Sequence, residues 1–162
     1  MFFAKEDALA IHTVASAAYR ILRDLAEGTG NSKFHESVKL MIKPGKEKKF
    51  WAAMNKSASF LKHADSDPDG ILEIKEEVND MTIAIACLYW ESLGNQLTPE
   101  MHGYMTWHVV INPDLFLDDT PAKKLLSQKD FDSLRTLPRA EQIELGKQIY
   151  FSILNPDLSS PK

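Results

Sequence analysis

Apolar residues recur at three- and four-residue intervals along most of this sequence, and glycine or proline ends each run. The longest run lies between Lys5 and Glu27 and stops at Gly28 and Gly30. Its apolar members are Ile11, Val14, Ala15, Ala18, Ile21, Leu22 and Leu25. This spacing is typical of one face of an amphipathic helix, and glycine often follows a helix because it adopts left-handed backbone angles without strain. We therefore expect a long helix whose apolar face packs against the rest of the protein.

Further helices are predicted from the same pattern, from capping residues and from prolines. They begin near Asn31 or Ser32, Lys46, Val78, Thr98-Pro99, Thr120-Pro121 and Pro138. The apolar run "TIAIACLYW" alone is also compatible with a buried strand. Strand signals are otherwise scarce, and 162 residues fit one domain. We expect an all-α, single-domain bundle of five or six helices over residues 1–162, in which residues 155–162 form a frayed tail.

Composition points to an ordinary globular protein. Hydrophobic residues make up 44% of the chain and charged residues 26%, which argues against disorder. The longest apolar run is shorter than the ~20 residues that a membrane helix needs, and acidic residues stand where a secretory signal would carry its apolar core. The one cysteine, Cys87, cannot form an internal disulfide. We expect a cytoplasmic protein that does not contact membranes.

The chain has a net charge of −4 and contains two adjacent blocks of opposite sign. Residues 33–62 hold eight lysines and two glutamates, a balance of +6, whereas residues 63–91 hold eight carboxylates and one lysine, a balance of −7. The blocks can form two solvated faces of the protein. Each block can also pair with the block of opposite charge in a second copy. Together with the aromatic helix after Pro99 they lead us to expect a homodimer. The absence of a broad basic stripe disfavours nucleic acid as a partner.

Residues 65–76, "DSDPDGILEIKE", resemble the calcium loop of an EF-hand. In that resemblance the carboxylate ligands are Asp65, Asp67, Asp69 and Glu76. Pro68 argues against calcium, because the fourth loop residue of an EF-hand usually has left-handed backbone angles and proline holds φ near −65°. A proline-initiated turn explains the same residues without a metal. We therefore expect no cofactor, with calcium as the alternative.

The helix end before this turn gathers polar side chains. Lys62 and His63 lie at a predicted C-terminus, where the helix dipole favours cations, and Asp65 and Asp67 can hydrogen-bond His63. A capping and turn motif explains this cluster without a ligand. If the protein has a ligand site, we expect it at these four residues, with His12 as a neighbour. The ligand would be a small polar molecule, an ion or a protein surface.

Two resemblances bear on function. Residues 60–68, "FLKHADSDP", and residues 10–25, "AIHTVASAAYRILRDL", resemble a family of small bacterial proteins, a resemblance that implies no particular activity. Lys56 and His63 have a spacing similar to that in the HEPN ribonuclease superfamily, dimeric helical bundles that use an arginine and a histidine. That resemblance implies His63 as general base on a ribose hydroxyl and Lys56 as the group that stabilises the phosphate.

Lysine at position 56 lacks the planar, bidentate grip of arginine on phosphate. No separate motif supports catalysis, and neither a phosphate-binding glycine loop nor a serine elbow occurs. We expect a binding or assembly module and not an enzyme. Ribonuclease activity through Lys56 and His63 and divalent metal binding are the alternatives.

Overall fold

The computed structural model describes residues 2–4, 7–30, 45, 47–63, 66, 69–112 and 132–155. All regular secondary structure within these ranges is helical, so the all-α prediction is confirmed. The elements are the 3-10 helix η1 (Phe2–Ala4) and the α-helices α1 (Ala8–Gly28), α3 (Glu47–Lys62), α4 (Glu76–Ser92), α5 (Pro99–Ile111), α7 (Asp132–Arg135) and α8 (Arg139–Leu154). The helices predicted to begin near Asn31 and at Thr120-Pro121, and the tail beyond Asn155, lie outside the described residues.

The chain divides into two compact units, Met1–Gly94 and Asn95–Lys162. The first unit contains α1, α3 and α4, and the second contains α5, α7 and α8. The prediction that residues 1–162 form a single domain stays a prediction.

Polar side chains fix the starts of two helices. The Asp7 carboxylate accepts hydrogen bonds from the backbone N–H groups of Leu9 (3.0 Å) and Ala10 (2.9 Å) and so caps α1. The Thr98 hydroxyl accepts one from the Met101 N–H (3.3 Å), and Pro99 follows as the first helical residue. Both caps satisfy N–H groups that have no partner inside the helix. The predicted start of the helix at Thr98-Pro99 is therefore confirmed.

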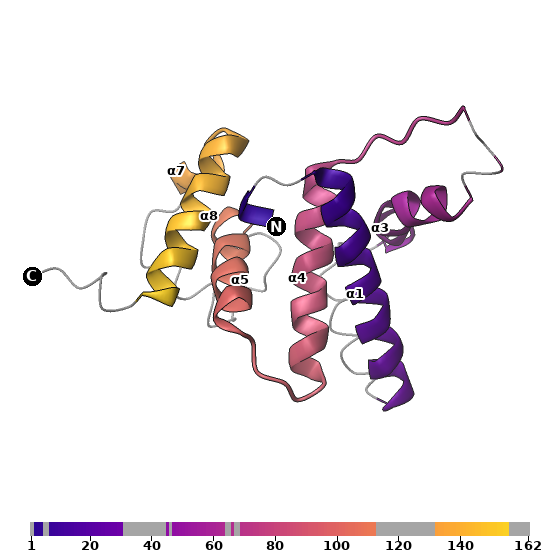
Figure 1. Cartoon of the computed structure of the whole chain (residues 1–162), viewed down its shortest axis with the longest axis horizontal. Coiled ribbons are helices and arrows are strands. Elements are labelled where there is room, and N and C mark those ends of the chain that lie inside the picture. Colours follow the sequence, from indigo (N-terminus) through magenta and orange to yellow (C-terminus); the bar gives the residue numbers. More distant parts are fainter. Residues whose placement is uncertain are drawn as a thin grey trace, which may run out of the picture. The chain divides into compact units, whose positions relative to one another are not determined.

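In the first unit, α1 and α4 lie side by side and run parallel (Figure 1). The first turn of α4 is hydrogen-bonded to the first turn of α1, where the Asn79 amide nitrogen donates to the Ala8 carbonyl at 2.9 Å. About three turns further along, the rings of Tyr19 and Tyr89 lie 5.9 Å apart. The run "TIAIACLYW" is thus a helix, and its burial comes from this pairing.

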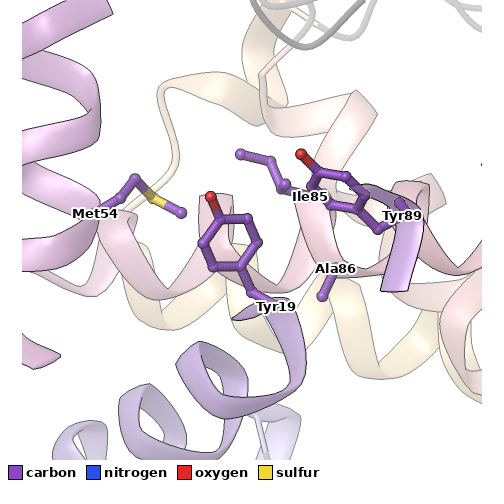
Figure 2. Close-up of a cluster of buried hydrophobic side chains, with 6 residues drawn as sticks. Tyr19, Met54, Ile85, Ala86 and Tyr89 are labelled. Carbon is purple, nitrogen blue, oxygen red and sulfur yellow. The ribbon is translucent and has the colours of Figure 1, made fainter. Parts of the chain in front are cut away.

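The core of the first unit joins three helices. Figure 2 shows Tyr19 of α1, Met54 of α3 and Ile85 and Tyr89 of α4 gathered in one cluster. Trp51 stacks on Tyr19 with the ring centroids 6.4 Å apart. Aromatic pairs of this kind contribute about 0.5–1.5 kcal/mol beyond the apolar area they bury. Burial also raises the pKa of Tyr89 to about 12, so this hydroxyl stays neutral in the core.

The second unit is built on the contact between α5 and α8. Trp107 is 0% exposed and donates its indole N–H to the Gln142 carbonyl at 2.6 Å. The two helices run antiparallel, and at Gly103 they approach so closely that an added Cβ would lie 3.2 Å from the Tyr150 Cα. The aromatic side chains that we expected in a core or at a dimer contact are buried inside this unit. They therefore give no support to the predicted dimer.

Candidate functional site

The most organised polar group in the described residues is a buried hydrogen-bond network between α1 and α4. The Asn79 amide nitrogen donates to the Ala8 carbonyl, which turns the amide oxygen toward the imidazole of His12, 2.8 Å from Nδ1. Nδ1 must then carry the proton. In the neutral ring the other nitrogen, Nε2, then accepts from the Ser16 hydroxyl at 3.0 Å. The geometry therefore assigns one tautomer to His12, whose two ring nitrogens are both occupied.

The three side chains are arranged as in a catalytic triad, with Ser16 in the place of the nucleophile, His12 in that of the base and Asn79 in that of the group that orients the base. Catalysis would require a substrate atom to come within about 3.5 Å of the Ser16 hydroxyl. Ser16 is 6% exposed and His12 is 0% exposed, so a substrate does not reach either group in this conformation. The network instead ties the N-terminal half of α1 to the first turn of α4.

We expect Asn79→Ala to destabilise the first unit by about 2–3 kcal/mol. The substitution removes two hydrogen bonds and leaves the buried Nδ1–H of His12 without a partner, and an unpaired buried group costs about 1–3 kcal/mol. Urea unfolding followed by circular dichroism measures the change. Asn55→Ala is the matched control, because among the described residues the Asn55 amide donates to the Trp51 carbonyl of its own helix and not to another helix. Equal losses in the two variants would contradict the role of Asn79.

The predicted ligand site lies partly within the described residues. Lys62 ends α3 and His63 follows it, with the His63 N–H bonded to the carbonyls of Ser59 and Phe60 at 3.1 Å each. The side chains of Lys62 and His63 are exposed. Asp65 and Asp67 lie outside the described residues, and no contact between His12 and His63 is recorded. The ligand site at Lys62, His63, Asp65 and Asp67 with His12 stays a prediction.

The two alternative functions also stay predictions. Lys56 and His63 are both exposed, Lys56 within α3 and His63 directly after it. For the calcium loop, Glu76 is the first residue of α4 and Asp69 is exposed, whereas Asp65, Asp67 and Pro68 lie outside the described residues. Within the described ranges, no three histidine, cysteine, aspartate or glutamate side chains gather in a group that could hold a metal ion.

Cys87 is buried in α4. Burial raises the pKa of its thiol to about 11, which leaves very little thiolate at neutral pH. Because the thiolate is the reactive form, Cys87 is a packing residue and not a nucleophile.

A second apolar face on α1 is the feature that sequence analysis missed. The predicted core face included Val14, Ile21 and Leu25, but these side chains are 57%, 61% and 53% exposed. At 100° per residue they lie within about 40° of one another, on a side of the helix about 120° from the middle of the buried face. The buried residues of α1 are Ile11, His12, Ala15, Ser16, Tyr19 and Ala26. The prediction that Val14, Ile21 and Leu25 face the core was therefore wrong.

Small residues continue the exposed face along α1. Ala10 and Ala17 are exposed and Ala18 is half-buried, and all three lie beside the large side chains on the helix surface. We call Ala10, Val14, Ala17, Ala18, Ile21 and Leu25 the α1 stripe. Apolar residues extend around roughly 200° of α1, about twice the width that one packed face requires. This excess width is visible in the sequence and indicates that part of the apolar surface stays outside the core.

No helix in the described ranges is long and apolar enough to cross a membrane. Comparisons of the chain with protein-family models, with curated proteins and with solved structures find no match.

Proposed function

We propose that the protein is a cytoplasmic binding or assembly module and that the α1 stripe is its contact surface. The observation that carries the proposal is the exposure of Val14, Ile21 and Leu25 on one side of a helix whose other side is already packed. Covering the exposed part of these three side chains contributes roughly 1 kcal/mol each. A regular row of this kind is what a partner helix requires, because i, i+7 and i+11 positions form a continuous ridge.

The chemistry of the partner follows from that of the stripe. None of its six members is charged or polar, so a complementary surface is apolar and helical. The charged side chain at its edge is Asp24, which lies about 20° from Ala17 around the helix and pairs with Arg23 at 2.7 Å. An apolar centre with a charged rim is the usual arrangement of a protein interface.

Ile21→Asp is expected to weaken the binding of a labelled amphipathic helical peptide at least 10-fold, because a carboxylate would have to lose its water at the centre of the contact. Fluorescence anisotropy measures the affinity, and circular dichroism checks that α1 stays folded. The matched control is Leu9→Asp, since Leu9 is also an exposed apolar residue of α1, 40% exposed, but lies about 120° from Ile21. Unchanged affinity in Ile21→Asp, or an equal loss in Leu9→Asp, would remove the stripe as the contact surface.

A further inference from the structure

We infer that the partner of the α1 stripe is α1 of a second copy, packed antiparallel about a two-fold axis between Ala17 and Ala18. This inference rests on the proposed function and names the partner of the same surface. It comes from the order of large and small side chains along the stripe, from the direction of the helix dipoles and from the absence of charge within the contact.

An antiparallel pairing about this axis sets large side chains against small or complementary ones. Leu25 of one copy meets Ala10 of the other, and Ile21 meets Val14. Ala17 meets Ala18 at the axis, where two small side chains let the helix backbones come close. The contact is thus narrow at the axis and wider by the same amount on either side of it, as in two helices that cross at their point of closest approach.

A parallel pairing would set each residue against itself. Leu25 would meet Leu25 at one end and Ala10 would meet Ala10 at the other, so the contact would be wide at one end and hollow at the other. The row of side chains therefore favours the antiparallel arrangement on packing alone.

Electrostatics favour the same direction. The N-terminus of α1 carries a partial positive charge and its C-terminus a partial negative charge, and an antiparallel pair brings opposite ends together. Arg23 and Glu27 lie about 140–180° from Val14 around the helix at 100° per residue. Asp24 stands at the edge of the stripe, where it pairs with Arg23 at 2.7 Å. No charge has to be buried when the two stripes meet.

The size of the contact predicts its strength. From Ala10 to Leu25 the stripe is about 22 Å long at 1.5 Å per residue. One helix pair of this length buries less than the roughly 1,200 Å² that stable complexes bury, so the dimer is expected to be reversible and to form at concentrations on the order of 0.1 mM.

Single cysteines placed on the stripe of the full chain test the arrangement. Antiparallel packing puts position 17 of each copy next to the two-fold axis. The two copies of position 25 lie about 22 Å apart along the helices, far beyond the roughly 7 Å limit between Cα atoms of a disulfide. We expect Ala17→Cys to form a disulfide-linked dimer under mild oxidation at least 10-fold faster than Leu25→Cys. A mixture of Ala10→Cys and Leu25→Cys chains should form the mixed dimer. The buried Cys87 is retained in all variants, and the wild-type chain measures any crosslinking through Cys87.

The crosslinking results distinguish three cases: an antiparallel dimer, a parallel dimer and a monomer. Equal crosslinking of Ala17→Cys and Leu25→Cys indicates a parallel pair and overturns the antiparallel arrangement. No crosslinking of either, with a monomer in sedimentation experiments at 0.5 mM protein, a few times the estimated midpoint, overturns the second copy as partner.

If the protein is a monomer without crosslinking, the rate at which Ile21→Cys reacts with a maleimide tests whether the stripe is accessible, as the proposed function requires. If Ile21→Cys reacts as fast as an exposed thiol, the stripe is accessible in the monomer and can still bind another helical protein. A rate reduced 100-fold or more in a monomer means that another part of this chain covers the stripe, and both proposals then fail.

Discussion

Trp107→Ala is expected to destabilise the second unit by about 3–5 kcal/mol, the usual range for removing a fully buried tryptophan. Trp107 is 0% exposed, and its ring lies 5.5 Å from that of Tyr104. Its loss leaves a large cavity between α5 and α8 and deprives the Gln142 carbonyl of a donor. Urea unfolding followed by circular dichroism measures the effect. A total stability of about 5–15 kcal/mol is typical of a domain, so this one change would remove a large fraction of the unit's stability.

Trp107→Phe separates packing from hydrogen bonding in this prediction. Phenylalanine fills most of the space but cannot donate to the Gln142 carbonyl, so we expect a smaller loss, about 1–3 kcal/mol. If Trp107→Ala cost no more than Trp107→Phe, the contact between α5 and α8 would not depend on the ring, and the description of the second core would be wrong.

Acid is expected to destabilise the same unit through His108. This side chain is 2% exposed and stacks on Tyr104. Burial, together with the positive charge of Arg139, lowers its pKa from 6.5 to about 4. In the unfolded chain His108 binds a proton below pH 6.5, whereas in the folded chain it stays neutral down to about pH 4. The free energy of unfolding is therefore unaffected by His108 above pH 6.5. It decreases as the pH falls from 6.5 toward 4, because the unfolded chain binds a proton that the folded chain does not.

The expected loss between pH 7 and pH 5 is about 2 kcal/mol, from 1.36 kcal/mol for each pH unit in this window. Denaturant unfolding at a series of pH values measures it, and His108→Gln should remove most of the slope. His102→Gln is the matched control, because His102 lies on α5 but is exposed. The prediction fails if the wild type and His108→Gln share one pH dependence.

Much of the fold follows from local signals. Periodic apolar residues predicted α1, α3 and α4, and the capping hydroxyl of Thr98 before Pro99 marked the start of α5. These features depend on residues a few positions apart, so a sequence displays them directly. The choice between helix and strand for "TIAIACLYW" needed the structure, because an apolar run buried on all sides has no period.

The candidate sites were harder to predict because they depend on tertiary contacts. His12 was expected beside His63, but its recorded partners are Ser16 and Asn79, and Asn79 is 67 residues away in the chain. The α1 stripe was missed for a related reason. Periodicity shows which residues of α1 are apolar, but only the packing of Tyr19 against Met54 and Tyr89 shows which side of the helix is buried.

The parallel pairing of α1 with α4 has a consequence for how the chain is made. His12 is bonded to a residue 67 positions downstream, and ribosomes add about 5–20 residues per second. A nascent α1 thus waits roughly 3–13 s for the helix that covers its core face, while its other apolar side stays uncovered as well. During that interval the newly made segment is a natural substrate for chaperones that hold unfolded apolar chains.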